Sequence, residues 1–410
     1  MGAETVTALA YDPFSPAVME NPLPFYKALR RDHPVFYSEK YDAYFFSRFD
    51  DVLELLSYVD NTFLQSEGPI PLPRDLVVHN DRAPTPMTME PFPGGAHMMM
   101  PVHGDLRQAH IKPMMPRAVA RLRSFVRELA DQRLDALLPT KRFNLTRDYG
   151  GLVSASVMMK LMGMPLEDAE RWLDLINSGT GVDPELGGFN GIPQARQVAE
   201  LVIPWIEKRM EAGADGSTPM VDGMINYRFE GKPLTPAQVG RALICAFIGG
   251  IETAPKIVAH GLMELNNRPE QMAAVRADLE ANVPKAAEEM IRYCAPAQWF
   301  MRTAHREVTV AGQKIRPGQR AFYLVASALR DEREFDNPDE FQWDRPIPRV
   351  LSFGHGVHYC IGAHLARMEV QVLVEAFMQR VPTFSFDMKS AIRPPTNFQW
   401  AWTQLPVLIP

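Results

Sequence analysis

The feature that constrains this chain most is one long apolar stretch that reads as a single helix. The segment TPAQ (235–238) forms a capping box with proline at the first helical position, which marks a helix start. The apolar pattern continues to about Asn266, roughly 30 residues or about 45 Å at 1.5 Å per residue. Because its middle, CAFIGGIETAPK, is almost entirely apolar, we expect this helix to cross the protein interior.

The middle of this helix holds residues that a purely structural helix avoids. Gly249 and Gly250 each cost about 1 kcal/mol relative to Ala, and Pro255 costs about 3 kcal/mol or more in a helix interior. Glu252 and Thr253 add a carboxyl and a hydroxyl, and a buried carboxylate is costly unless it is paired. A packing kink with a salt-bridged Glu252 is one explanation. Together, however, these residues favour a site where the helix opens, a small molecule approaches and protons move.

Apolar periodicity elsewhere predicts a mainly α protein with small β sheets at its margins, folded as one domain over residues 1–410 with a lead-in over 1–20. Helices are expected at residues 23–32, 50–57, most of 104–228, 269–280, 285–293 and 361–380. Strands are expected at VFYS, AYFFS, VTVAGQKI and RAFYLVAS.

Two segments read as loops. Residues 66–101 are rich in proline, apolar and without periodicity, which indicates a loop folded over something. The glycine-rich segment 178–193 lies between two helical stretches and is a candidate entrance lid.

Charge and cysteine content exclude several classes of protein. A net charge of −6 argues against nucleic-acid binding. The three cysteines, Cys245, Cys294 and Cys360, are far apart and odd in number, so they favour a reducing cytoplasm over a disulfide framework. We see no signal peptide and no uninterrupted apolar run long enough to cross a bilayer, so we expect no membrane span.

Cys360 lies among histidines and glycines in LSFGHGVHYCIGAHLAR (351–367) and has four possible roles. Zinc could take it with His355, His358 and His364, but the spacing fits no common zinc pattern. A catalytic thiol could use His358 or His364 as its base, but nothing supplies a third, orienting residue. A silent buried cysteine leaves the surrounding glycines unexplained.

An axial thiolate explains more of the segment. A cysteine leading into a helix sits at the positive end of the helix dipole, which we expect to lower the thiol pKa. Gly356 permits a tight turn, Gly362 lets backbone pass close to a flat macrocycle, and Phe353 can shield the sulfur from water. A thiolate held in this way can bind heme iron.

Three motifs then resemble one family. FGHGVHYCIG (353–362) matches F-x-x-G-x-x-x-C-x-G, GGIET (249–253) matches an oxygen-activation motif, and EMIR (289–292) matches E-x-x-R. In this order and spacing the chain resembles the cytochrome P-450 heme-thiolate monooxygenases, and among them the soluble bacterial class. The resemblance implies a single-domain fold with heme between the long central helix and the helix after the cysteine loop.

The resemblance also implies roles for individual residues. Cys360 would be the axial ligand of heme b (iron protoporphyrin IX), and Glu289 and Arg292 would form a buried structural pair. Glu252 and Thr253 would be the acid–alcohol pair that supplies protons for oxygen activation. Further cofactor-binding residues would be His103, Arg107, Arg302, Phe353, His358 and Gly362.

The segments that line the substrate pocket in similar proteins correspond in this chain to residues that are partly aromatic and include amide side chains. This composition suggests a small to medium hydrophobic substrate, terpenoid or aromatic. The candidates are Met98, Met99, Phe247, Gly249, Gln298, Trp299, Phe300, Asn397 and Phe398.

Electrons need a separate source, since no flavin or nicotinamide fingerprint is present. We expect a monomer that takes O2 and a ferredoxin or flavodoxin donor with its reductase. A basic face for docking would comprise Lys112, Arg117, Arg121, Arg123 and Arg127. Two alternatives stay open: a heme-thiolate enzyme that uses peroxide or does no redox chemistry, and a non-catalytic heme or zinc sensor.

Overall fold

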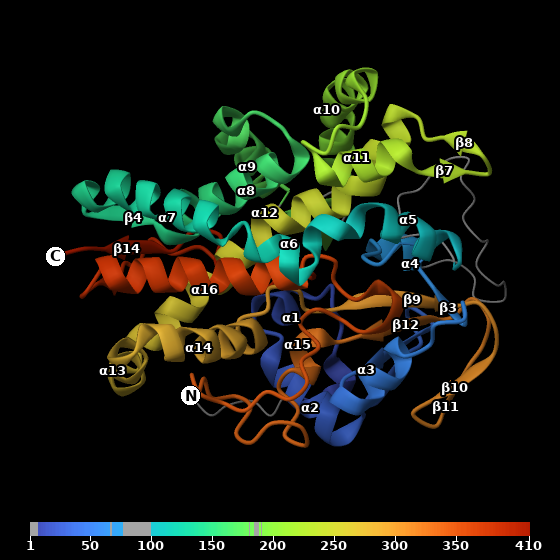
Figure 1. Cartoon of the computed structure of the whole chain (residues 1–410). Helices are drawn as coiled ribbons and strands as arrows, with labels where there is room; N and C mark the ends of the chain where they lie inside the picture. Colours follow the sequence, from blue (N-terminus) through green and yellow to red (C-terminus); the bar gives the residue numbers. More distant parts are fainter. Residues whose placement is uncertain (1–6, 66–67, 77–99, 180, 184–187, 190) are drawn as a thin grey trace.

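The long helix predicted from the capping box runs through the middle of the protein (Figure 1). α12 (Pro236–Asn266) starts where Gln238 N–H donates to Thr235 Oγ1 at 3.3 Å and Thr235 N–H donates to Gln238 Oε1 at 2.8 Å, which confirms the predicted start. Its length and composition would suit a membrane span, but 61% of its most apolar window is buried inside this protein. The computed structural model describes residues 7–65, 68–76, 100–179, 181–183, 188–189 and 191–410, so Met98 and Met99 lie outside the described chain.

Helices form the larger part of the molecule, and α16 lies between α7, α12 and α14 (Figure 1). A π-helical segment, Leu145–Gly151, precedes α8 and packs on α12. The helices besides α12 are α1 (Pro16–Glu20), α2 (Leu23–Asp32), α3 (Phe49–Leu56), α4 (Pro73–Leu76), α5 (Val102–Ile111), α6 (Pro116–Ala120), α7 (Arg123–Leu137), α8 (Leu152–Met162), α9 (Ala169–Asn177), α10 (Gly191–Ala212), α11 (Pro219–Asn226), α13 (Pro269–Ala277), α14 (Leu279–Tyr293), α15 (Val325–Ala328) and α16 (Ala363–Arg380).

The largest sheet has the strand order β1-β2-β12-β9-β3 and joins strands from the first 64 residues to strands between Phe300 and Tyr323. β2 and β12 pair in parallel, with Ala43 opposite Arg320, while the other pairs in this sheet are antiparallel. Its strands are β1 (Val35–Ser38), β2 (Ala43–Phe46), β3 (Phe63–Leu64), β9 (Phe300–Ala304) and β12 (Arg320–Tyr323). Smaller sheets are made by β4 (Arg142–Asn144) with β13 (Ser385–Phe386) and β14 (Pro406–Leu408), β5 (Val182–Asp183) with β6 (Gly188–Phe189), β7 (Arg228–Phe229) with β8 (Lys232–Pro233), and β10 (Val308–Val310) with β11 (Gln313–Ile315).

Two predicted boundaries are wrong. α14 begins at Leu279 rather than near 285, because the Asp278 side chain caps it by accepting from Ala281 N–H at 3.1 Å, and Pro284 lies inside the helix. RAFYLVAS is not one strand: β12 ends at Tyr323, and the residues after it form α15.

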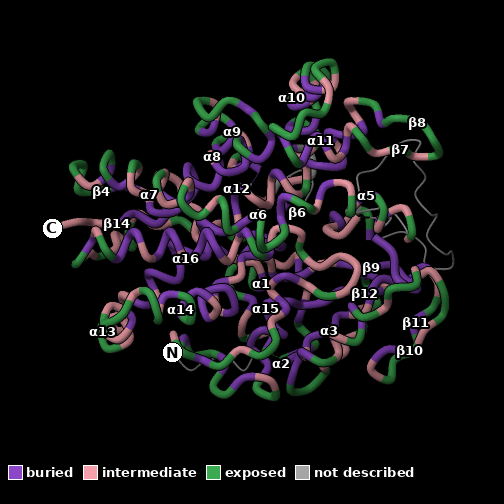
Figure 2. Tube along the Cα trace, in the orientation of Figure 1, coloured by how far each residue is buried: buried purple, intermediate pink, exposed green. Residues whose placement is uncertain are grey.

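The core falls into three clusters around these elements. The largest surrounds α8, α12 and α16, whose traces are mostly buried (Figure 2). The other two cover opposite faces of the large sheet, so that Tyr323 faces one cluster and Phe322 faces the other. The alternation that puts neighbouring strand residues on opposite faces explains this division.

Candidate functional site: the cysteine loop and the central helix

The cysteine loop turns sharply before α16. Gly354 and Gly356 have positive φ values of 68° and 69°, a region that favours glycine. A Cβ on Gly356 would stand 2.3 Å from the carbonyl oxygen of Leu56, so this glycine also lets the loop approach the end of α3. Cys360 N–H donates to Phe353 O at 2.8 Å and fixes the cysteine within the turn.

Opposing influences act on the Cys360 thiol. The side chain is accessible, yet enough protein surrounds it that desolvation raises its pKa, against the N–H of Gly362 and the charges of Arg107 and Arg367, which lower it. The net direction is upward, so the expectation that the helix start lowers this pKa is wrong for the protein by itself. A metal cation on the sulfur would reverse the balance, because coordination favours the thiolate.

Side chains from α5 hold the cysteine loop. His103 Nε2 lies 3.0 Å from Val357 O, and Arg107 Nη2 donates to Tyr359 O at 2.5 Å. The rings of His103 and His358 are 4.3 Å apart between centroids. The residues predicted at the cofactor on α5 and in the cysteine loop therefore form one unit.

Arg302, another residue predicted at the cofactor, is a buried cation on β9. Its guanidinium lies 5.1 Å from the centre of the Tyr323 ring. Burial lowers the pKa of both Arg302 and Arg107, and no carboxylate in the described chain pairs with Arg107. The Arg107 guanidinium, partly buried and without a carboxylate among the described residues, favours an anionic group from elsewhere. Cations beside a sulfur ligand fit a cofactor that carries both a metal ion and carboxylates.

The two glycines in the middle of α12 have different surroundings. A Cβ on Gly250 would lie 2.5 Å from Met158 Sδ, so this position lets α8 approach. A Cβ on Gly249 would meet nothing within 4 Å. Thr253 Oγ1 donates to Gly249 O at 2.7 Å, so the hydroxyl lies beside this uncrowded part of the helix.

Glu252 is part of a buried cluster that the sequence did not reveal. Its two oxygens accept from Lys256 Nζ at 2.8 Å and from Gln399 Nε2 at 2.9 Å, and Lys256 also donates to Gln399 Oε1 at 2.6 Å. All three side chains are buried. The i, i+4 spacing of Glu252 and Lys256 was a usable signal. Gln399 lies far along the chain, and nothing in its neighbourhood marked it.

The Glu289–Arg292 pair is present and more extensive than predicted. Arg292 Nε and Nη2 each donate to a Glu289 oxygen at 2.7 Å, and both side chains are 0% exposed. Arg292 also donates to the carbonyls of Leu329 and Pro338, and Arg345 Nε adds a bond to Glu289 at 3.2 Å. Arg345, which was not predicted, makes this a three-residue cluster.

The structure separates the pocket candidates into two groups. Phe247 packs edge-to-face on Trp172 at 5.4 Å, Trp299 lies in the core on one face of the large sheet, and Gln298 is hydrogen-bonded to Tyr26 and Thr396 O. These three residues have structural contacts.

Phe300, Phe398 and Asn397 form the other group, which touches the first because the Phe398 and Trp299 rings lie 5.9 Å apart. The Phe300 and Phe398 rings lie 5.2 Å apart. Asn397 is 2% exposed, and neither its amide nitrogen nor its amide oxygen has a partner among the described residues. Because unpaired buried amide atoms are costly, Asn397 is suited to receive a polar group.

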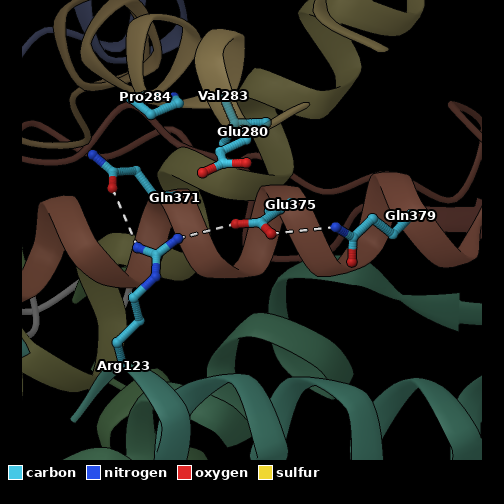
Figure 3. Close-up of a pocket in the computed structure, with 7 residues that line it drawn as sticks. All are labelled: Arg123, Glu280, Val283, Pro284, Gln371, Glu375 and Gln379. Carbon is cyan, nitrogen blue, oxygen red and sulfur yellow. Dashed lines mark hydrogen bonds and ion pairs between the residues drawn. The ribbon is translucent and has the colours of Figure 1, made fainter. Parts of the chain in front are cut away.

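The predicted basic face is partly neutralised. Arg123 pairs with Glu375 at 3.0 Å beside a groove of about 270 Å³ between α7, α14 and α16 (Figure 3). Arg127 pairs with Glu375 and Asp131. The groove contains none of the motif residues, and helix-to-helix contacts explain its charges. Lys112, Arg117 and Arg121 are exposed and have no ion-pair partner within the described ranges.

Comparison with known proteins decides the family. The family profile of cytochrome P450 matches residues 197–409, slightly more than half of the chain. The chain belongs to the cytochrome P450 family. P450 123 of Mycobacterium tuberculosis is 28% identical over 406 residues, covering 98% of this chain and 97% of the relative. The biotin biosynthesis cytochrome P450 of Bacillus subtilis is 27% identical over 396 residues, covering 95% and 96%.

Solved cytochrome P450 structures share the fold. P450BioI, in complex with an acyl carrier protein ligated to hexadec-9Z-enoic acid, is 25% identical with a TM-score of 0.80, covering 96% of this chain and 99% of that one. The P450 PksS of the Bacillus subtilis bacillaene polyketide synthase has a TM-score of 0.81 at 22% identity, covering 98% and 100%. The predicted fold and family are confirmed: the protein is an oxidoreductase of the P450 monooxygenase type, and this family binds heme b through a cysteine thiolate.

Proposed function

We propose that this cytochrome P450 inserts one oxygen atom from O2 into a small to medium hydrophobic substrate, terpenoid or aromatic, with electrons from a separate ferredoxin-type carrier. The observation that carries the proposal is the union of Cys360, His103 and Arg107 in one hydrogen-bonded unit. Such a unit supplies both the sulfur and the cations that heme requires. We propose that residues 1–410 act as one heme-binding domain, as a monomer in the cytoplasm.

Cys360 would be the thiolate ligand, and His103, Arg107, Arg302 and His358 would hold the propionates. Phe353 is buried, the Arg367 guanidinium lies 4.6 Å from its ring, and the Phe353 carbonyl accepts from Cys360 N–H, so a buried ring anchors the turn that holds the cysteine. When bound, heme supplies the activation of O2. The protein supplies position and charge.

Thr253 and Glu252 would move the protons that oxygen activation consumes. The Thr253 hydroxyl lies beside Gly249, where the helix is uncrowded. Glu252 lies one turn after Gly249 and is held by Lys256 and Gln399. Gln399 belongs to the C-terminal hairpin, which consists of β13, β14 and the residues between them. This contact lets the hairpin influence the orientation of the carboxylate.

The substrate side would combine Gly249, Phe300 and Phe398 with Asn397, and Met98 and Met99 complete the proposed set. Apolar rings with one amide suit a hydrophobic compound that carries one hydrogen-bonding group. One similar protein, P450BioI, forms a complex with an acyl carrier protein ligated to hexadec-9Z-enoic acid, so a hydrophobic chain is bound by a protein of this fold.

The electron donor would be a ferredoxin or flavodoxin that docks on Lys112, Arg117 and Arg121. These side chains are exposed and lie between α5 and α7, next to the elements that hold the cysteine loop. Opposite charge on the carrier would speed association and make it salt-dependent.

The test is the absorbance of the purified, heme-loaded protein after reduction with dithionite and addition of carbon monoxide. A strongly red-shifted Soret band is expected, and Cys360→His should abolish it while Cys294→Ala keeps it. A colourless protein, or a histidine-type band in the unmodified chain, would contradict the proposal. Substrate class is tested by Soret shifts across a compound panel, and a response to long fatty acids alone would overturn the terpenoid or aromatic assignment.

A further inference from the structure

One face of α12 remains accessible although the helix crosses the protein. Arg241, Cys245 and Gly249 follow one another at four-residue spacing, with Ile244 and Ile248 beside them. All five are partly accessible or, for Cys245, exposed, and most residues on the other sides of this helix are buried. Residues at this spacing share one stripe of a helix.

The opposite face shows which way this stripe points. A Cβ on Gly240 would lie 3.5 Å from Ala199 O of α10, a Cβ on Gly250 would strike Met158 of α8, and Phe247 meets Trp172 of α9. The accessible stripe therefore turns away from α8, α9 and α10. Farther along the helix the same side carries Glu252, which contacts Gln399 of the C-terminal hairpin.

Arg241 is the one cation on this stripe, and its charge has no partner among the residues that the structure describes. Its Nε is buried without a hydrogen bond, and no acceptor in the described part of the chain takes a bond from its guanidinium. Structural arginines elsewhere look different: Arg209 bonds Asp215, Asp222 and Thr218. A half-buried guanidinium among isoleucines is suited to a carboxylate-like group, which its planar fork matches.

The length of the stripe sets the distance between its cation and the open part of the helix. Arg241 and Gly249 are eight residues apart, which is about 12 Å along a helix. The side chains between them on this face, Ile244, Cys245 and Ile248, are apolar or weakly polar. A ligand lying along the stripe would thus meet a cation at one end and the Thr253–Gly249 region at the other.

We propose that Arg241 binds an anionic group of the substrate, a carboxylate or similar oxyanion, and that the hydrophobic body lies along the stripe toward Gly249. The inference rests on the proposed function and narrows its substrate class to hydrophobic acids. Oxidation is then expected about 12 Å from the anionic group, because α12 sets that separation.

The experiment uses the heme-loaded protein and measures dissociation constants from the Soret shift. The probes are 4-hexylbenzoic acid and abietic acid, each compared with its own methyl ester. We expect the acids to bind more tightly than the esters, and Arg241→Gln to weaken acid binding by about 10- to 100-fold while changing ester binding by less than about threefold. Arg241→Lys should retain part of the preference. Arg171→Ala, which removes an exposed arginine on α9, is the matched control and should change neither.

The outcomes separate the two levels of the proposal. If the reduced, carbon monoxide-bound spectrum has no red-shifted band, the proposed function fails. If that band is present and acids and esters bind equally, or Arg241→Gln weakens both equally, the anionic subsite is overturned and the heme-thiolate reading stands. Calorimetry of acid binding to the same proteins provides a readout independent of the chromophore.

Discussion

Two buried charge clusters do different work in this protein. The α14 cluster has a glutamate, Glu289, between the guanidiniums of Arg292 and Arg345. Arg292 also donates hydrogen bonds to backbone carbonyls. The α12 cluster has a glutamate, Glu252, between one lysine and one amide. Both are buried, but Glu289 is 0% exposed and Glu252 is 8% exposed.

The comparison shows that a buried glutamate paired with a cation can be held in one arrangement in one place and can exchange hydrogen bonds in another. A planar guanidinium bonded on every edge has one arrangement, so the α14 cluster locks the irregular segment before the cysteine loop to α14. An ammonium on a flexible stem can re-aim its protons. The α12 cluster can therefore change its bonds beside Thr253 without unfolding its surroundings.

The largest effect is expected from Arg292→Leu. It leaves the buried Glu289 with one guanidinium, that of Arg345, and the backbone N–H of Gln342, and it removes bonds from carbonyls of the Leu329–Glu340 segment. The free energy of unfolding should therefore fall by about 3–5 kcal/mol. Urea denaturation measures the loss, and Arg345→Leu gives a milder version if the first variant fails to fold. Lys314→Ala, which breaks the exposed pair with Glu307, is the control and should cost less than about 1 kcal/mol. If Arg292→Leu also costs less than about 1 kcal/mol, the α14 cluster does not hold the segment before the cysteine loop rigidly.

A third buried glutamate sharpens the comparison, because no cation in the described ranges of the chain pairs with it. Glu369 on α16 accepts from Ser154 Oγ at 2.5 Å, and its other oxygen has no partner among the described residues. Desolvation raises its pKa to about 7. Between about pH 4.3 and about pH 7 the folded protein keeps a proton on Glu369 that the unfolded chain has released. The free energy of unfolding therefore falls as pH rises through this range. Above about pH 7 both states have lost the proton, and Glu369 causes no further change.

Glu369→Gln should remove this pH dependence. At pH 8 the variant is expected to be up to about 3 kcal/mol more stable than the unmodified protein, and near pH 4 the two should be alike. Urea denaturation at several pH values measures both. An unchanged pH profile would show that Glu369 does not titrate in this range.

Lys256→Met should have an intermediate effect of about 2 kcal/mol, because Glu252 keeps its bond to Gln399. Coupling between O2 consumed and product formed should fall as well, since the carboxylate loses the group that orients it. Gln399→Leu tests the other contact. If Lys256→Met changes stability alone and coupling stays constant, the cluster is structural, as the α14 cluster is.

The smallest effects concern the adjacent glycines of α12. Gly249→Ala should stabilise the helix by about 0.5–1 kcal/mol because its Cβ meets nothing, and it should weaken substrate binding. Gly250→Ala should instead destabilise the protein, since Met158 must move. Thermal denaturation of the pair, with Soret titrations, distinguishes the two. Equal shifts would mean that the helix face beside the α12 cluster is not open.

The sequence predicted what depends on local pattern. The capping box located α12, and the three motifs identified the family and the Glu289–Arg292 pair. It missed contacts that tertiary folding creates, such as Gln399 on Glu252 and Arg345 on Glu289. It also misjudged the Cys360 pKa, because the helix-start argument is local whereas desolvation depends on every segment that folds around the sulfur.

The parallel pairing of β2 with β12 has a consequence for biosynthesis. Because Ala43 of β2 pairs with Arg320 of β12, most of the chain has to leave the ribosome before these two strands can pair. Until then β2 can pair only with β1, its other edge stays without β12, and nascent chains of this length are prone to aggregate. Synonymous codons that slow translation once β12 has left the ribosomal exit tunnel should therefore raise the yield of soluble protein more than the same codons placed earlier.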